Sequence, residues 1–312
     1  KELQAYSEHL EERVKERTAE LASLNLIYER FVPREFIDLL HKKSILEINL
    51  GDQVSHRMTV MFADIRGWTT LLEKMTPQQA FNFINAYLRR VSPIIKECNG
   101  FIDQYYGDGV MALFPGPPDD AVRAAVSMQT AVAEYNKERA QDGYDPIGIG
   151  VGLHLADLML GVIGSEDRMQ GAVVADAVNL AARIEGLNKM YGSYVSLSDE
   201  TFFSIKDPNR YRHRFIDKVR VKGREDPVTV YEVFEGDPAT IAGLKEQTKP
   251  SFENGLQLYY AKKFSEASVH FNQVLEKNPA DLAARIYLKR CANYMVNGVP
   301  PEWTGVETLL EK

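Results

Sequence analysis

A short β-hairpin near the middle of the chain places the strongest constraint on the fold. Residues 101–106 and 110–114 are rich in aromatic and aliphatic side chains, and only Gly107-Asp108-Gly109 separates them. Glycine and aspartate at this spacing are typical of a tight turn. The two runs are therefore predicted to pair as neighbouring antiparallel strands of one sheet.

The residues before this hairpin predict a strand and a long helix. Residues 58–64 form a strongly apolar strand that ends in a carboxylate. Thr76 supplies an N-cap, Pro77 occupies the first helical position and Gln79 completes a capping box. A helix is therefore expected from this point to about residue 100.

Helices and strands alternate after the hairpin. The expected elements are a helix capped by Asp119 or Asp120 that reaches about Tyr135, strands over 147–154 and 158–163, and a helix capped by Asp176 that reaches Leu187. The order strand, helix, hairpin, helix, strand predicts an α+β fold with helices on one face of a sheet.

The N-terminal segment has the pattern of a coiled coil. Residues 3–31 lack Gly and Pro, and a heptad assignment places seven apolar side chains among nine seam positions. The seam positions are Leu3, Ser7, Leu10, Val14, Arg17, Leu21, Leu24, Tyr28 and Phe31. We expect a signalling coiled coil over 1–32, then a connector over 33–55 that begins with a short helix over 34–42. An amphipathic helix packed on its own domain is the alternative.

The composition is that of an ordinary globular protein. The 312 residues are 45% hydrophobic and carry a formal net charge of −7, which excludes intrinsic disorder as the main state. A slightly acidic chain lacks the positive field of a nonspecific nucleic-acid binder, so no nucleic-acid partner is expected. Two distant cysteines, Cys98 and Cys291, give no disulfide framework, which favours a reducing, cytoplasmic location.

No membrane segment is predicted within these residues. The chain has no apolar run near the roughly 18 residues of a membrane span, and its first residues are not those of a signal peptide. The first residue is Lys rather than Met, so we expect a fragment. The full-length protein is expected to carry an upstream sensor domain and could be attached to a membrane.

The composition changes after Phe234. Asp237-Pro238 and residues 248–250 are predicted to form a linker, and residues 252–296 have a helical pattern. Seven positions in this segment fall close to one tetratricopeptide unit: Gly255, Tyr259, Phe264, Ala267, Phe271, Pro279 and Ala284. One such unit cannot bury its own apolar face, so the tail over 250–312 is expected to dock on the main domain or on a partner.

Two carboxylates are predicted to meet at one edge of the sheet. Asp64 ends a strand and Asp108 lies in the hairpin turn, so pairing of that strand with the hairpin would bring them together. Such carboxylates repel each other unless divalent cations neutralise them, and oxygen ligands favour Mg²⁺ or Mn²⁺. The arrangement suits a two-metal phosphate reaction. Taken singly, each Asp could instead be a local cap or turn residue.

Four motifs follow one another along the middle of the chain. They are Phe62-Ala-Asp64-Ile-Arg-Gly67-Trp-Thr69, Tyr106-Gly107-Asp108-Gly109, Asp176-Ala-Val178-Asn179-Leu-Ala-Ala-Arg183 and Val221-Lys222-Gly223. In this order they resemble the motif set of the class III nucleotidyl cyclases. The resemblance covers about 57–234 and implies a ferredoxin-like catalytic domain over 56–236. The helical ends are similar to those of bacterial, especially cyanobacterial, adenylate cyclases.

The resemblance implies an adenylate cyclase, which converts ATP to 3′,5′-cyclic AMP and pyrophosphate. In this family the 3′-hydroxyl attacks the α-phosphate of the same nucleotide. Asp64, Asp108 and the backbone carbonyl of Ile65 would hold two Mg²⁺ or Mn²⁺ ions per site. These residues would position groups and stabilise charge.

The same resemblance gives roles to a second group of residues. Asn179 would orient the ribose, Arg183 would compensate charge on the α-phosphate, and Lys222 would bind the terminal phosphates. Asn179 and Arg183 are four residues apart on a predicted helix, so they share one side of it. Without the family pattern they would read as a solvated helix face.

The family's site is divided between two subunits. One subunit supplies the carboxylates, and the other supplies the Asn, Arg and Lys. We therefore expect a homodimer with two equivalent sites, and the coiled coil would shift the catalytic domains in response to the upstream sensor.

The expected base-binding residues, Gln104 and Ala172, match neither branch of the family. Adenylate cyclases of this type carry a Lys that contacts adenine N1 at the first position, and a Thr or Asp that contacts the 6-amino group at the second. Guanylate cyclases carry Glu, then Cys or Ser. Gln can bond either purine and Ala offers no polar contact, so selectivity is expected to be relaxed, with ATP as the first substrate and GTP as the alternative.

Two other places depart from the family pattern. They are His154-Leu155-Ala156-Asp157 and Ala175-Asp176. Asp157 would be unfavourable beside a triphosphate if its side chain faced inward. Two functions therefore remain open: an active dimeric cyclase, and a degenerate cyclase domain that serves as a nucleotide-sensing or dimerisation module.

Overall fold

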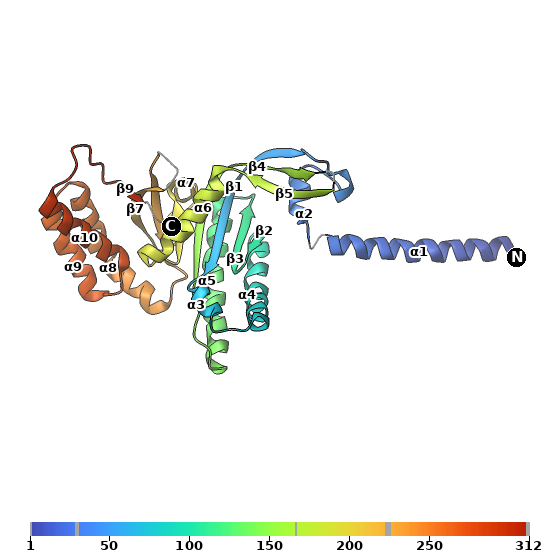
Figure 1. Ribbon diagram of the computed structural model, residues 1–312, viewed down its shortest axis with the longest axis horizontal. Coiled ribbons are helices and arrows are strands. Elements are labelled where there is room, and N and C mark those ends of the chain that lie inside the picture. The colour runs from blue at the N-terminus through green and yellow to red at the C-terminus, as the bar shows by residue number, and fades with distance from the viewer. Residues whose placement is uncertain (1, 29–30, 166, 222–225, 310–312) are drawn as a thin grey trace. The chain divides into compact units, whose positions relative to one another are not determined.

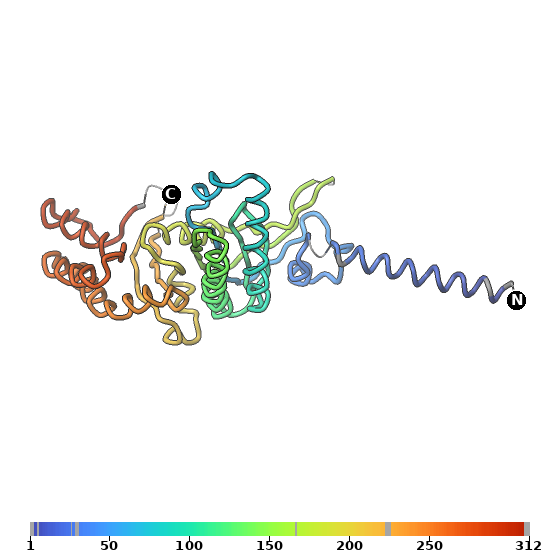
Figure 2. Tube along the Cα trace, turned by 90° about the horizontal axis from the view of Figure 1, so that it is seen from below, coloured from blue at the N-terminus to red at the C-terminus, as the bar shows by residue number. Residues whose placement is uncertain are grey.

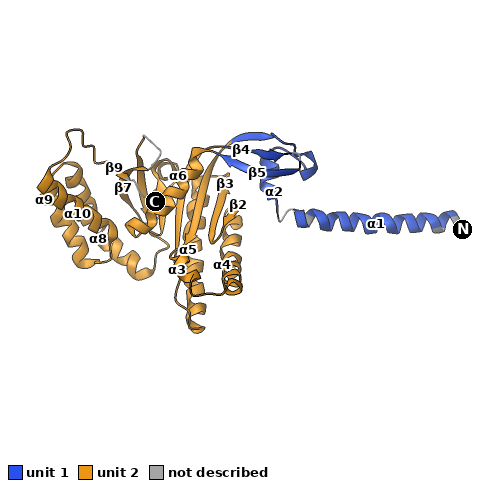
Figure 3. Ribbon diagram, in the orientation of Figure 1, with its two compact units in different colours: residues 1–55, 159–174 blue, residues 56–158, 175–312 orange. Residues whose placement is uncertain are grey.

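The computed structural model describes residues 2–28, 31–165, 167–221 and 226–309 (Figure 1). The chain divides into two compact units. One unit contains residues 1–55 and 159–174, and the other contains residues 56–158 and 175–312 (Figure 3). No helix in the described ranges is long and apolar enough to cross a membrane.

The first unit begins with a long helix whose apolar seam is exposed. Helix α1 (Glu2–Tyr28) confirms the predicted helix. All seven apolar seam side chains, Leu3, Leu10, Val14, Leu21, Leu24, Tyr28 and Phe31, are exposed. The coiled coil therefore stays a prediction with its seam exposed, and so does the alternative in which this helix packs on its own domain.

The connector packs against a β-hairpin in the same unit. Helix α2 (Arg34–Leu39) and the 3₁₀ turn η1 (Ile45–Glu47) follow Pro33. Residues 159–165, the end of strand β4 (Ile149–Ser165), pair antiparallel with β5 (Arg168–Val174). Phe36 of α2 is buried, and its ring lies against β5, where a Cβ at Gly171 would be only 2.9 Å away from it. The absence of a side chain at that glycine makes room for the aromatic ring.

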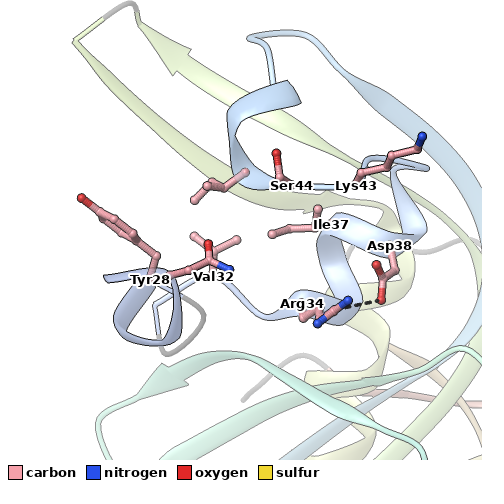
Figure 4. A pocket seen from close by; sticks show the side chains of 9 residues that line it. Tyr28, Val32, Arg34, Ile37, Asp38, Lys43 and Ser44 are labelled. Atoms are coloured by element: carbon pink, nitrogen blue, oxygen red, sulfur yellow. Dashed lines mark ion pairs between the residues drawn. The ribbon is translucent and has the colours of Figure 1, made fainter. Parts of the chain in front are cut away.

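A small pocket lies where the end of α1 meets the connector (Figure 4). Its volume is about 90 Å³, and Tyr28, Val32 and Ile37 are among the side chains that line it. Arg34 and Asp38 form an ion pair of 3.9 Å at its edge (Figure 4). Ligand sites usually enclose about 300–1,000 Å³, so this pocket is too small for a nucleotide.

The sheet confirms the predicted α+β class. Its strand order is β2-β3-β1-β4-β6-β8-β7-β9, and β5 pairs with β4 outside this path. β2 and β3 pair antiparallel, as predicted, and β1 pairs antiparallel with β3. The strands not yet given are β1 (Gln53–Ile65), β2 (Phe101–Tyr106), β3 (Gly109–Phe114), β6 (Val195–Ser198), β7 (His213–Val221), β8 (Val228–Val233) and β9 (Glu307–Leu309).

The helices lie on both faces of the sheet. Helices α4 (Pro77–Glu97) and α5 (Pro118–Gln141) run side by side and pack on one face, where Val151 and Leu153 of β4 join their core (Figures 1 and 2). Gly152 faces the other way, and a Cβ there would lie 2.3 Å from the backbone nitrogen of Glu185 in helix α6 (Asp176–Tyr191). The expectation of helices on one face only is therefore wrong for α6.

The predicted helix starts are correct for α4 but not for α5 and α6. Thr76 and Gln79 form the predicted capping box, with bonds of 3.3 and 2.8 Å. The N-cap of α5 is Pro117 and that of α6 is Ala175, so the three aspartates predicted as caps instead lie in the first turns, where they favour the helix dipole. Three short elements were not assigned bounds from the sequence, although shorter helix and strand signals were expected up to Val233. They are α3 (Trp68–Leu72), α7 (Asp199–Phe203) and η2 (Pro208–Arg210).

Three helices follow β8 in the C-terminal part of the chain. Helix α8 (Ala239–Tyr260) runs unbroken through residues 248–250, so the linker predicted there is wrong. Helices α9 (Phe264–Lys277) and α10 (Leu282–Asn297) follow, and Trp303 packs on the ring of Tyr259 at 5.4 Å between centroids. The apolar face of the tail packs on α6, β7 and β8, which confirms the expected docking on the main domain.

Buried ion pairs join the tail to the sheet. Arg214 of β7, only 1% exposed, bonds to Glu232 of β8 at 2.8 Å and to Asp281 at 2.7 Å. Asp281 caps α10 by accepting the N–H of Ala284 at 3.0 Å. Lys245 of α8 pairs with Glu232 as well. The start of α10 is thus fixed to the sheet by charges that water cannot reach.

Replacement of Arg214 by Met should lower the free energy of unfolding by about 3–5 kcal/mol, because the carboxylate of Asp281 would stay buried without its cation. Urea denaturation measures this change. Arg57→Met is the control, since it removes an exposed ion pair with Glu200 and should cost less than about 1 kcal/mol. Equal, small losses in both variants would contradict the role given to the buried pair.

Candidate active site

Asp64 and Asp108 come together at one edge of the sheet. Pairing of Ala63 with Val110 places the end of β1 beside the β2–β3 turn. The backbone N–H of Ile65 donates to Asp64 Oδ1 at 3.0 Å and to Asp108 Oδ2 at 3.2 Å. The structure therefore confirms that the two carboxylates lie close together, as predicted.

The electrostatics of this pair favour a bound cation. Burial and the nearby carboxylate of Asp64 raise the pKa of Asp108 to about 8, although the Ile65 N–H acts in the opposite direction. No cluster of three or more His, Cys, Asp or Glu side chains suited to a metal occurs among the described residues. Two carboxylates that share one donor fit Mg²⁺ or Mn²⁺, with the remaining ligands left to a backbone carbonyl, water and substrate oxygens.

Two further residues lie near Asp64 and Asp108, and the sequence analysis identified neither of them. Tyr87 of α4 is fully buried, and its hydroxyl has no hydrogen-bond partner among the described residues. Burial, Asp64 and Asp108 all raise its pKa. Burial and Asp64 also raise the pKa of Glu185 in α6 to about 7, with Arg66 opposing the shift. Tyr87 falls in an apolar helix pattern and Glu185 in a polar one, so neither gave a signal in sequence.

Gln104 lies on the sheet face opposite α4 and α5. Gln104 lies opposite Met111 in the β2–β3 register, and Met111 lies opposite Phe62 of β1. The three residues therefore share that face of the sheet. The ring of Phe62 stacks on Tyr106 with 6.0 Å between centroids. Gln104 thus presents a partly exposed amide beside flat apolar groups, which suits contact with a purine base.

The second predicted base contact, Ala172, belongs to the other unit. It pairs with Gly161 in the β4–β5 hairpin and is buried, and its methyl group offers no hydrogen bond. Its assignment to a base pocket stays a prediction. Asp157 of β4 has an exposed side chain.

Helix α6 carries the remaining predicted residues that the structure describes. Asn179 is exposed and Arg183, one turn later, is partly buried. The Nη1 atom of Arg183 is buried without a hydrogen-bond partner within the described part of the chain. Lys222 lies outside the described residues, between the end of β7 at Val221 and the start of β8 at Val228.

A pocket of about 510 Å³ lies between α4 and the end of α5, and the predicted site residues do not line it. Arg139 and Tyr144 are among its side chains. The predicted site residues are also missing from the small pocket of the connector. Asp64 and Asp108 therefore lie outside both pockets in the single chain.

Residues 51–234 match the adenylate and guanylate cyclase catalytic domain family, and the chain belongs to this family. An adenylate cyclase from Anabaena cylindrica is 40% identical over 212 residues, which are 66% of this chain and 42% of that protein. The terminal-differentiation specific adenylate cyclase of Dictyostelium discoideum is 33% identical over 274 residues, 86% of this chain and 13% of that protein. The chain thus spans less than half the length of these relatives.

Solved structures agree with the fold. The guanylyl cyclase Cya2 is 31% identical with a TM-score of 0.50, and the match covers 61% of this chain and 98% of that one. The adenylyl cyclase CyaB from P. aeruginosa is 29% identical with a TM-score of 0.52, covering 58% and 95%. The resemblance to class III cyclases is confirmed for the catalytic domain.

The Asp103→Asn variant tests the cost of burying a carboxylate beside Gln104. Burial raises the pKa of Asp103 from 3.8 to about 6. Between these values the folded chain holds a proton that the unfolded chain has released, so the stability due to this group falls as pH rises through that window. The variant should gain about 1–3 kcal/mol over the parent at pH 7.5 and nothing below about pH 4.

Urea unfolding of parent and variant at matched pH values measures this gain. Because all other titrating groups are shared, they cancel in the difference. A gain that stays the same from pH 4 to pH 8 would contradict the assigned pKa.

Proposed function

We propose that this chain is a nucleotidyl cyclase that converts ATP to 3′,5′-cyclic AMP and pyrophosphate. The observation that carries the proposal is the pair of carboxylates, Asp64 and Asp108, held against one backbone N–H at the end of β1. The two curated relatives described above, from Anabaena cylindrica and Dictyostelium discoideum, are adenylate cyclases.

Asp64, Asp108 and the backbone carbonyl of Ile65 are the residues proposed to hold two Mg²⁺ or Mn²⁺ ions. Such ions lower the pKa of the 3′-hydroxyl and offset the charge of the triphosphate. The chain's own part is to fix one carboxylate at the end of β1 and the other in the adjacent β2–β3 turn, so that little reorganisation is needed when the nucleotide binds.

A second subunit is proposed to complete each site. Asn179 would orient the ribose, Arg183 would offset charge on the α-phosphate, and Lys222 would bind the terminal phosphates. The exposure of Asn179 and the unbonded Nη1 of Arg183 support this assignment, since both groups lack a partner of their own in the described chain. An edge site outside the two pockets described above also fits completion by a homodimer.

The N-terminal helix is proposed to join the two subunits. Its six apolar seam side chains, from Leu3 to Tyr28, are exposed in the single chain, and a parallel coiled coil would bury them. An upstream sensor in the full-length protein would act through this helix on the catalytic domains. A cytoplasmic location remains part of the proposal.

Relaxed base selectivity is the second candidate function. The amide of Gln104 can donate to adenine N1 or accept from guanine N1. The guanylyl cyclase Cya2 is as similar to this chain in fold as the adenylyl cyclase CyaB. We therefore propose ATP as the principal substrate and GTP as a slower one.

Replacement of Asp64 or Asp108 by Ala should abolish Mn²⁺ binding and lower turnover by about 10²-fold or more, because each change removes one of the two carboxylates proposed to hold the metal ions. Calorimetry with Mn²⁺ and a turnover assay measure the two effects, and thermal unfolding checks the fold. Asp157→Ala is the control, since it removes an exposed carboxylate from β4 and should change neither. Parent-like Mn²⁺ binding in both site variants would show that the metal assignment is wrong.

The Gln104→Lys variant should raise the ratio of kcat/KM for ATP over GTP by about tenfold. A lysine donates to adenine N1, whereas guanine N1 carries a proton and cannot accept. Tyr105→Lys is the matched control, because its side chain leaves the strand on the opposite sheet face. An unchanged ratio in Gln104→Lys would remove this residue from the base pocket.

A further inference from the structure

The fully buried carboxylate of Asp217 in β7 joins the tail to α6, the helix that carries Asn179 and Arg183 and is called the catalytic helix below. It accepts hydrogen bonds from the hydroxyl of Tyr191 at 2.6 Å and from the hydroxyl of Tyr287 at 2.8 Å. It also pairs with Arg290 Nη1 at 2.6 Å. Tyr191 is the last residue of α6, whereas Tyr287 and Arg290 belong to α10. One side chain thus ties two helices that are distant in sequence.

A β-bulge creates this junction. Phe215 pairs with Tyr231 and Asp217 pairs with Val230, so Ile216 is an extra residue in β7. The single proton of the Tyr287 hydroxyl is shared between Asp217 Oδ1 and the carbonyl of Ile216, which lies 3.0 Å from the hydroxyl oxygen. A bulge frees backbone groups from the ladder and redirects the neighbouring side chains. The strand is therefore irregular where Tyr287 and Arg290 of α10 make their polar contacts with it.

Three contacts fix the position of α6 on the sheet. The helix rests on β4 at Gly152, where a Cβ would lie 2.3 Å from the backbone nitrogen of Glu185. The side chain of Asn188 donates to the carbonyl of Val151 at 3.0 Å. Tyr191 follows three residues later, about 60° away around the helix axis. The contact at Gly152 sets the distance of the helix from the sheet, and the bonds made by the side chains of Asn188 and Tyr191 set its rotation about its own axis.

We infer that the C-terminal tail positions the catalytic helix through Asp217, which makes Tyr191 and Arg290 positioning residues for the cyclase reaction. The inference rests on the proposed function, in which α6 carries Asn179 and Arg183. Arg183 lies eight residues before Tyr191, or about 12 Å along the helix. A small rotation at the Tyr191 anchor therefore changes the direction in which Arg183 points, and misplacement of catalytic groups is costly for rate.

The tail contains a matched control for this junction. The hydroxyl of Tyr294 in α10 donates to Glu307 at 2.8 Å, and this bond reaches α6 only indirectly, through the longer 3.7 Å ion pair between Glu307 and Arg290. Tyr191→Phe and Tyr294→Phe each remove one hydroxyl and keep the ring. Both should lower the melting temperature, and Tyr191→Phe should lower it more, because Asp217 is fully buried whereas water can reach Glu307.

Steady-state kinetics of the full chain with Mn²⁺ and ATP separate the two variants. Tyr191→Phe should lower kcat by about threefold to tenfold and keep KM within about twofold of the parental value. Loss of the bond between Tyr191 and Asp217 should disturb the positioning of Arg183 in the transition state more than it disturbs substrate binding. Tyr294→Phe should keep the parental kcat. Equal kcat values in the two variants would overturn the inference.

Arg290 gives a second, independent comparison. Arg290→Lys keeps a cation near Asp217 and should retain most of the parental kcat, whereas Arg290→Met should fall at least as far as Tyr191→Phe. If Arg290→Met does not fold, the comparison of Tyr191→Phe with Tyr294→Phe still tests the inference. A fully active Arg290→Met that folds would overturn the inference.

Amide hydrogen exchange keeps this inference separate from the proposed function. Tyr191→Phe should speed exchange in α6, and Tyr294→Phe should not, whether or not the chain turns over nucleotide. A parent protein without cyclase activity would refute the proposed function while the exchange data still test the anchor. Unchanged exchange in α6 of Tyr191→Phe would refute the anchor itself.

Discussion

The repulsion between the carboxylates of Asp64 and Asp108 is the constraint on which the site depends. Antiparallel pairing of β1 with β3 forces the two groups together, and the N–H of Ile65 is a donor they share. Burial makes the second negative charge costly, as the raised pKa of Asp108 shows. A site that keeps this cost in its resting state is prepared for a cation and for a negatively charged substrate.

The rest of the catalytic domain supports this edge from two sides. Helices α4 and α5 fill one face of the sheet with a continuous apolar core. Helix α6 lies on the opposite face and brings Asn179 and Arg183 with it. The tail then packs on α6, β7 and β8, where buried ions at Arg214 and Asp217 hold it. The tail is therefore part of the domain's core.

Local sequence signals predicted the local features of this fold. The capping box at Thr76 and the Gly107-Asp108-Gly109 turn depend on neighbouring residues only, and both are present. The position of α6, the unbroken helix through Pro250 and the roles of Tyr87 and Asp217 depend on contacts between distant segments. Such contacts leave no periodic pattern, so a sequence read from neighbour to neighbour does not contain them.

A complementation assay tests the shared site most directly. Asp108→Ala and Arg183→Ala chains, each inactive alone, would be mixed and allowed to exchange subunits before turnover is measured. In a heterodimer one of the two sites is intact, so random pairing should restore about a quarter of the parental rate per chain. A mixture as inactive as either variant alone would contradict the shared site, as would substantial turnover by either variant by itself.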